Sequence, residues 1–164
     1  MNNANVRALP QKKQDFLAAI VAAAQASRHH TGIPASITVA QCLLESGWGE
    51  SKLSTQGRNY FGIKADDSWK GAVLLMPTQE FMGGKWITVT ARWRKYDTMQ
   101  QSIDDHASFL LHNERYRPCF LFKNSYRGFA HGLQDCGYAT DPFYAHQLID
   151  TIECYGLQFF DFPV

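Results

Sequence analysis

The sequence has little net charge and no apolar run long enough to cross a bilayer. Its 16 basic and 15 acidic residues give a net charge of +1, which provides no electrostatic footprint for nucleic acid or for an anionic membrane surface. The apolar run at residues 16–24 is too short for a membrane span. We therefore expect neither nucleic-acid binding nor membrane insertion.

Patterns that would indicate a metal, a phosphate or a catalytic triad are also missing. The four cysteines (Cys42, Cys119, Cys136 and Cys154) form no CxxC pair and no zinc-finger spacing with the histidines, and HExxH is absent. No glycine loop has P-loop spacing, and no serine, cysteine or histidine lies in a triad signature. We expect no metal and no cofactor. The cysteines should be buried thiols or form at most one or two disulfides.

With 164 residues, the chain is long enough to form one domain with its own core. Residues 1–10 are predicted to be a flexible lead-in and residues 11–164 a single domain. The run at residues 16–24 follows Lys12 and Lys13 and so imitates a secretory signal, but Gln14 and Asp15 interrupt the transition from basic to apolar residues. A cleaved signal and a retained helix both fit this pattern, and the retained helix fits better.

Hydrophobic periodicity predicts an α+β fold in which a helical body carries one β-hairpin. Helices are expected at residues 11–30, 34–46 and 126–136, with another starting at Thr98, where Gln101 completes a capping box. Residues 48–53 should form a short helical turn and residues 54–58 a loop. Arms at residues 69–82 and 85–96, joined by two glycines, should form a half-buried antiparallel ribbon. Asp141 and Pro142 should start a last helix, which ends at Gly156.

Residues 41–51 place a carboxylate at the end of an apolar helix. At about 100° per residue, Gln41 and Glu45 share the strip opposite the apolar face. Gly47 should end this helix, so Glu45 lies at the negative end of the helix dipole. That position, with Trp48 nearby to exclude water, should raise the pKa of Glu45. A general acid needs such a carboxyl group, although a solvated glutamate at a helix end would share the pattern.

A second carboxylate across a cleft would allow hydrolysis of a glycosidic bond. Glu80 lies near the tip of the predicted hairpin and is the candidate for this role; Asp66, Asp67 and Asp97 are its rivals. Aromatic rings can stack on the apolar faces of sugars, although core packing explains most aromatic residues equally well. The residues considered for a sugar groove on this basis are Trp48, Tyr60, Phe61, Tyr96 and Tyr138.

Four motifs, in order along the chain, resemble the glucosaminidase domain of glycoside hydrolase family 73, which includes flagellar hydrolases and bacterial autolysins. They are residues 32–51, which end in Leu44-Glu45-Ser46-Gly47-Trp48-Gly49-Glu50-Ser51; Asn59-Tyr60-Phe61-Gly62-Ile63-Lys64; Thr78-Gln79-Glu80; and Gly137-Tyr138-Ala139-Thr140-Asp141-Pro142 with Tyr144. The resemblance covers residues 16–160. Any one of these motifs alone would be unspecific.

The resemblance implies a lysozyme-like fold and cleavage of the β-1,4 bond between N-acetylglucosamine and N-acetylmuramic acid in peptidoglycan. Glu45 would be the general acid, Glu80 the second carboxylate, and Tyr138 a residue near the reacting sugar. Asn59 and Thr140 join the substrate-binding candidates by motif position. The alanine-rich run would be a retained helix, so no cleavable signal is expected.

Related chemistries remain open at this stage, because a muramidase or lytic transglycosylase also uses a helix-borne glutamate. A silent glycan-binding or assembly module is a further alternative. The expected partner is the peptidoglycan glycan strand in the periplasm or cell wall, reached by phage lysis, a secretion system or another route. We expect a monomer, and an immunity protein only if the chain is an injected effector.

Overall fold

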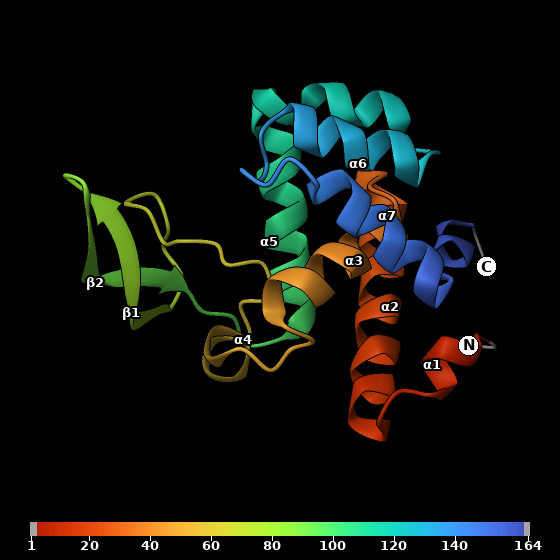
Figure 1. The fold of residues 1–164 in the computed structure, drawn as a ribbon, viewed down its shortest axis with the longest axis horizontal. Coiled ribbons are helices and arrows are strands. Elements are labelled where there is room, and N and C mark those ends of the chain that lie inside the picture. The colour runs from red at the N-terminus through yellow and green to blue at the C-terminus, as the bar shows by residue number, and fades with distance from the viewer. Residues whose placement is uncertain (1–2, 163–164) are drawn as a thin grey trace.

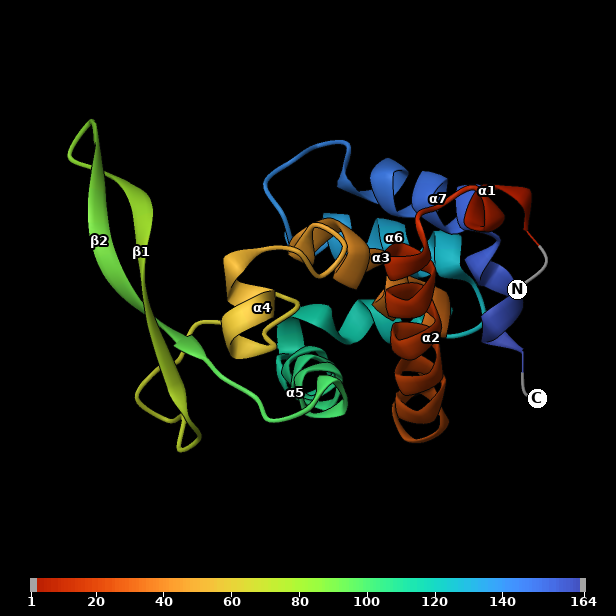
Figure 2. The ribbon, with the colours of Figure 1, turned by 90° about the horizontal axis from the view of Figure 1, so that it is seen from below.

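The computed structural model describes residues 3–162 as a helical body from which a single β-hairpin projects (Figures 1 and 2). Both ends of the described chain lie on the side of the body away from the hairpin. In chain order the elements are α1 (Ala4–Arg7), α2 (Gln11–Thr31), α3 (Ala35–Ser46), α4 (Lys52–Gly57), β1 (Val73–Met82), β2 (Lys85–Arg94), α5 (Met99–His112), the 3₁₀ helix η1 (Glu114–Phe122), α6 (Tyr126–Asp135), α7 (Tyr144–Tyr155) and the 3₁₀ helix η2 (Leu157–Asp161).

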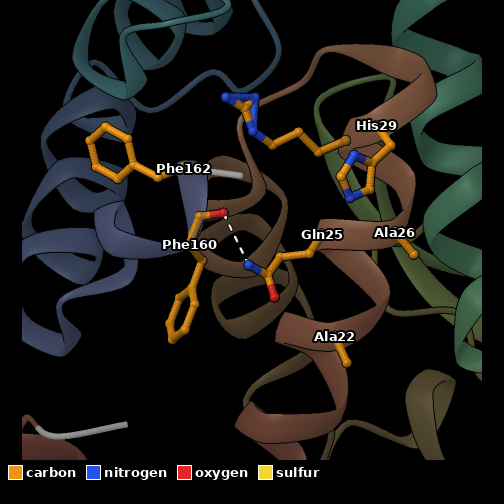
Figure 3. Close-up of a pocket in the computed structure, with 7 residues that line it drawn as sticks. Ala22, Gln25, Ala26, His29, Phe160 and Phe162 are labelled. Carbon is orange, nitrogen blue, oxygen red and sulfur yellow. Dashed lines mark hydrogen bonds between the residues drawn. The ribbon is translucent and has the colours of Figure 1, made fainter. Parts of the chain in front are cut away.

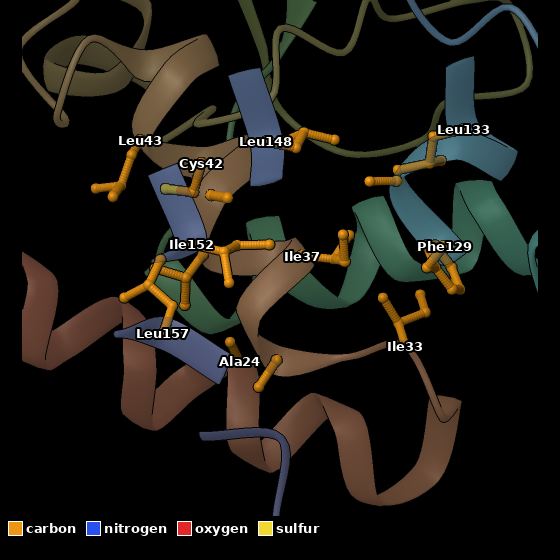
Figure 4. Close-up of a cluster of buried hydrophobic side chains, with 14 of the residues drawn as sticks. Ala24, Ile33, Ile37, Cys42, Leu43, Phe129, Leu133, Leu148, Ile152 and Leu157 are labelled. Carbon is orange, nitrogen blue, oxygen red and sulfur yellow. The ribbon is translucent and has the colours of Figure 1, made fainter. Parts of the chain in front are cut away.

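Helix α3 lies at the centre of the body, and its residues 35–43 are all buried. Helices α2, α6 and α7 and the η2 segment pack around it. Figure 4 shows Ile37 and Leu43 of α3 among Leu148 and Ile152 of α7. A helix that is apolar on nearly every side must be enclosed by others. The carboxyl end of α3 is the part that reaches the surface, and that end carries Glu45.

The predicted helix ends are largely confirmed. Gly32, Gly47 and Gly156 end α2, α3 and α7 in the left-handed conformation, which glycine adopts without a Cβ clash. Thr98 and Gln101 form the predicted capping box at the start of α5.

Two predicted boundaries are wrong. Residues 52–57 form α4, where a loop was expected from residue 54, because the side chain of Ser51 accepts a hydrogen bond from Ser54 N and so caps a new helix. Helix α7 begins at Tyr144 and not at Asp141. The Asp141 carboxylate accepts a hydrogen bond from Phe143 N at 2.8 Å and holds a turn before the helix.

The segment predicted as a flexible lead-in contains a short helix in the structure. Residues 1 and 2 lie outside the described residues, but α1 follows directly and packs on α7. Val6 is buried, and Asn5 Nδ2 donates a hydrogen bond to Cys154 O at 2.8 Å. These contacts fix the segment before α2 to the far end of the chain.

The hairpin has the predicted antiparallel pairing, with Gly83 and Gly84 both at positive φ in the turn. Its strands are shorter than expected, because residues 69–72 and 95–96 belong to the flanking loops. Leu74, Met76, Thr78 and Glu80 are half-buried and alternate with the exposed residues 75, 77, 79 and 81, so one face of β1 is half-buried. The half-buried face on β2 carries Val89, Ala91 and Trp93, whereas the tip is exposed on both sides.

All four cysteines are free thiols; Cys42 and Cys119 are buried, Cys136 is half-buried and Cys154 is exposed. Among residues 3–162, no helix has both the length and the apolar character needed to cross a membrane. The same residues contain no cluster of three or more side chains suited to hold a metal ion.

Candidate active site

A cleft of about 630 Å³ lies where the base of the hairpin meets the helical body. Glu45, from the last turn of α3, is on its wall. Aromatic side chains form another part of the cleft wall, and charged side chains from the hairpin base lie across the cleft from these aromatic residues. Its lining consists of Glu45, Phe61, Gly62, Ile63, Lys64, Asp66, Arg94, Phe109, Tyr116, Tyr138, Ala139 and Thr140. A carboxylate, an aromatic wall and a charged rim in one groove suit a sugar ligand.

Two side chains from the body fix the Glu45 carboxylate. Tyr144 Oη donates a hydrogen bond to Glu45 Oε1 at 3.3 Å, and Gln41 Nε2 donates to Tyr144 Oη at 3.0 Å. Gln41 lies one helical turn before Glu45 on α3, so the three groups form a chain from the core to the cleft. Glu45 is an exposed residue, but desolvation of its carboxylate raises its pKa above the usual range. The hydrogen bond from Tyr144 opposes this rise.

Replacing Tyr144 with phenylalanine should move the alkaline limb of the pH–activity profile to higher pH. The Tyr144 hydroxyl stabilises the ionised form of Glu45, so its loss raises the pKa of Glu45 further. A general acid works when protonated, and activity falls as pH rises through its pKa. Profiles of kcat/KM against pH would measure the limb. Tyr155→Phe is the matched control, because that ring packs against Trp48; a limb that moves to lower pH in Tyr144→Phe would contradict the argument.

Tyr138 lies beside this chain of hydrogen bonds. Its ring stacks on Tyr144, with centroids 5.5 Å apart, and contacts Tyr116 at 5.9 Å. Tyr138 Oη is 3.1 Å from His106 Nε2. Burial raises the pKa of Tyr138 well above its usual range, so the hydroxyl remains protonated. Tyr138, which lines the cleft, therefore carries a neutral hydroxyl group.

Glu80 does not line the cleft directly. It lies on the half-buried face of β1, and its Oε1 is 2.6 Å from Nζ of Lys64, which does line the cleft. One carboxylate oxygen is thus occupied by Lys64. The other, Oε2, has no protein hydrogen bond among the described residues.

The rival carboxylates differ in their surroundings. Asp66 lines the cleft, but its Oδ1 accepts hydrogen bonds from Ser68 N, Ser68 Oγ and Trp69 N, which lower its pKa. This pattern is that of a turn-forming aspartate. Asp67 and Asp97 are exposed and lie outside the cleft lining.

The structure brings Phe61, Tyr138 and Thr140 into the cleft with Glu45 but places four other sequence candidates elsewhere. Trp48 packs edge-on against Tyr155, and Tyr60 packs against Phe16. Tyr96 is buried and donates a hydrogen bond to Asp105 Oδ2 at 2.7 Å. Asn59 is buried as well; it donates to Ile63 O and Arg94 O and accepts from Ile63 N, so its amide holds the hairpin base.

Comparison with known proteins identifies the family of this chain. The sequence pattern of one protein family, described as mannosyl-glycoprotein endo-beta-N-acetylglucosaminidase (Glucosaminidase), matches residues 21–157. The chain belongs to this glucosaminidase family of glycoside hydrolases. The resemblance to glycoside hydrolase family 73 is thereby confirmed.

Two curated relatives are similar to this glucosaminidase over most of its length. The chain is 36% identical over 149 residues to the peptidoglycan hydrolase FlgJ of Escherichia coli K12, an alignment that covers 88% of this chain and 47% of FlgJ. It is 37% identical over 155 residues to the exo-glucosaminidase LytG of Bacillus subtilis, which covers 92% of this chain and 54% of LytG. The chain thus spans about half the length of these relatives.

Solved structures confirm the predicted α+β fold with its hairpin lobe. The catalytic domain of the autolysin Auto from Listeria monocytogenes aligns with a TM-score of 0.83 and 30% identity, over 94% of this chain and 90% of that domain. A mutant peptidoglycan hydrolase from Sphingomonas sp. A1 aligns with a TM-score of 0.72 and 35% identity, over 90% of this chain and 97% of the other.

Sequence reasoning missed several residues of the glucosaminidase cleft. Gln41 and Tyr144 orient Glu45, and Tyr116 and Phe109 complete the aromatic wall. The sequence could have indicated Gln41 as a site residue, since it shares the strip of α3 that carries Glu45. Phe109 and Tyr116 had none, because only the packing of α5 and η1 brings them to the cleft.

A second hollow, of about 550 Å³, lies on another face of the glucosaminidase, between α2 and the C-terminal segment (Figure 3). Ala22, Gln25, Ala26 and His29 come from α2, and Phe160 and Phe162 from the other side. Gln25 Nε2 donates a hydrogen bond to Phe160 O at 3.4 Å. Among the described residues that line this hollow, none has an acidic side chain to serve as the acid in glycoside hydrolysis.

Proposed function

We propose that this chain is a peptidoglycan endo-β-N-acetylglucosaminidase that cleaves the β-1,4 bond between N-acetylglucosamine and N-acetylmuramic acid. The observation that carries the proposal is Glu45, a carboxyl group of raised pKa fixed by Tyr144 at the wall of an aromatic cleft. Its relatives FlgJ, a peptidoglycan hydrolase, and LytG, an exo-glucosaminidase, support the choice of substrate.

Glu45 acts as the general acid. Because its pKa is raised, Glu45 keeps its proton to higher pH than a free glutamate does, and that proton passes to the glycosidic oxygen as the bond to the sugar breaks. Tyr144 holds the carboxylate in place through the reaction and stabilises the negative charge that Glu45 acquires. Phe61 and Thr140 line the cleft and contact the bound glycan.

Glu80 is the second carboxylate, either as the base that activates water or as a negative charge near the oxocarbenium-like state. Its salt bridge to Lys64 holds it beside the cleft rim. Asp66 is the weaker candidate because three hydrogen bonds already occupy its Oδ1. Tyr138, with its neutral hydroxyl, holds the acetamido group of the reacting sugar.

Mass spectrometry of the fragments released from purified sacculi tests the proposal. Soluble fragments with N-acetylglucosamine at the reducing end are expected, with long fragments appearing early, as internal cleavage requires. N-acetylmuramic acid at the reducing end would indicate a muramidase, and 1,6-anhydro ends a lytic transglycosylase. Early release of single sugars would indicate an exo-enzyme, and binding without soluble products a glycan-binding module. Each of these four outcomes would contradict the proposal.

The proposed substrate determines where we expect the chain to act. Peptidoglycan lies in the periplasm or cell wall, so the chain acts there as a monomer on glycan strands. A phage lysin, a secretion-associated hydrolase and an injected effector all meet this requirement. An immunity protein would accompany only the injected effector.

A further inference from the structure

His106 lies buried in α5 directly behind the aromatic wall of the cleft. It is 1% exposed, and its Nε2 is 3.1 Å from Tyr138 Oη. Its other ring nitrogen, Nδ1, is buried and has no hydrogen-bond partner among residues 3–162. The Tyr138 hydroxyl is therefore the one polar group that this part of the chain offers to the imidazole ring.

The packing around His106 fixes the plane of the ring. Phe61 stacks on it face to face, with centroids 3.9 Å apart and an angle of 7° between the planes. Tyr138 meets it edge-on, with centroids 6.0 Å apart and an angle of 84°. Phe61 and Tyr138 both line the cleft, so His106 joins the Asn59–Lys64 segment to the turn that carries Tyr138.

The unpartnered Nδ1 decides which nitrogen carries the proton. A neutral imidazole has one N–H group and one lone pair. With the proton on Nδ1, a buried N–H would have no acceptor, and orphaned buried N–H groups are rare in folded proteins. With the proton on Nε2, the N–H group donates to Tyr138 Oη and only a lone pair is left unpartnered. Tyr138 Oη then accepts this bond, and its own proton is free to point elsewhere.

We propose that His106 is a positioning residue whose Nε2–H group donates to Tyr138 Oη and thereby directs the Tyr138 hydroxyl proton into the cleft, toward an acceptor oxygen of the bound sugar. This inference rests on the proposed function, because it assigns Tyr138 a donor role toward the substrate. His106 touches no substrate and transfers no proton. Burial lowers the pKa of His106 to about 3, so the ring stays neutral and the arrangement holds across the working pH range.

Nitrogen NMR of the wild-type protein tests the tautomer without any activity measurement. The ¹⁵N shifts of His106 should show a protonated Nε2 and a bare Nδ1, unchanged between pH 5 and pH 8. A proton on Nδ1, or titration of the ring in that range, would overturn the proposal. The result stands whether or not the protein cleaves peptidoglycan, so it separates this inference from the proposed function.

A double-mutant cycle tests the role in catalysis. His106→Phe keeps a ring against Phe61 but removes the donor, and kcat should fall about tenfold, as for loss of one hydrogen bond in the transition state. His106→Gln restores an N–H donor and should recover most of the loss. In a Tyr138→Phe background, His106→Phe should change kcat less than about twofold, because the group on which it acts is gone.

His112→Phe is the matched control, since His112 lies on the same helix but is exposed, and its kcat should equal that of the wild type. An equal tenfold loss in the Tyr138→Phe background would show that His106 supports the fold of the cleft and does not act through Tyr138. Failure of His106→Gln to recover activity would lead to the same conclusion. A wild-type protein that releases no glycan fragments would refute the proposed function, and the NMR result would still decide the tautomer.

Discussion

Glu45→Gln is expected to lower kcat on purified sacculi by about 10²–10⁴-fold, the contribution usual for a positioned general acid. Glutamine keeps the size of the side chain and can still accept the hydrogen bond from Tyr144, so the cleft should remain intact. What is lost is the proton that Glu45 gives to the leaving oxygen. Release of soluble fragments, measured by reducing ends at several pH values, would quantify the loss.

Glu50→Gln is the control for this variant. Glu50 is exposed, pairs with Lys12 at 3.2 Å and lies outside the cleft lining, so its change should leave kcat within about twofold of wild type. The melting temperature of both variants should match that of the wild type. A Glu45→Gln protein with normal kcat would refute the assignment of Glu45 as the acid.

Glu80→Gln is expected to have the second-largest effect, a fall in kcat of about 10²-fold, because a second carboxylate near the reacting sugar contributes on that scale. The change removes the negative charge but keeps an oxygen that can accept a hydrogen bond from Lys64. The pKa of Glu45 should hardly respond, so the alkaline limb of the pH profile should stay in place while its height falls.

Asp66→Asn provides the comparison, because Asp66 lines the cleft and is the rival carboxylate. Its side-chain oxygens serve a turn and Arg94, so the expected result is a small loss of stability and a kcat within about fivefold of wild type. A large loss of kcat in Asp66→Asn with normal kcat in Glu80→Gln would reverse the two roles. Full activity in both would indicate that the acetamido group of the substrate replaces the second carboxylate.

The sequence predicted those parts of the fold that depend on local signals. The apolar face of α3, the glycines at helix ends and the Thr98–Gln101 capping box each carry their own short-range pattern. The start of α7 was misplaced because Asp141 and Pro142 serve equally well as a helix start and as a turn. Local chemistry allowed both, and in the structure the Asp141 carboxylate accepts its hydrogen bond within the turn.

The site was predicted less completely, for a physical reason. Glu45 could be found because the residues adjacent to it in the sequence indicate its position at the end of an apolar helix. Asn59, by contrast, lies in a recognisable motif but turns inward, with both of its amide atoms bonded to backbone groups. A motif shows that a residue type is needed at a position. It does not show whether the side chain faces a ligand or the protein interior.

For the pKa of Glu45, the sequence predicted the direction of the shift but not its structural cause. Its rise was expected partly from Trp48, but that ring packs against Tyr155 and lies under Lys13, away from the cleft lining. Desolvation of the carboxylate by its surroundings remains the cause, and Tyr144 moderates it. The direction of the pKa shift agrees with the prediction, but Trp48 is not the neighbour that causes it.

Both ends of the described chain lie on the side of the helical body away from the hairpin, and the cleft lies at the base of that hairpin. A surface, bead or carrier domain attached through either end would therefore leave the groove facing outward. Such a tether would orient the enzyme without blocking entry of a glycan strand. Immobilised preparations anchored at one end should thus keep the activity of the free protein, whereas anchoring through the hairpin should not.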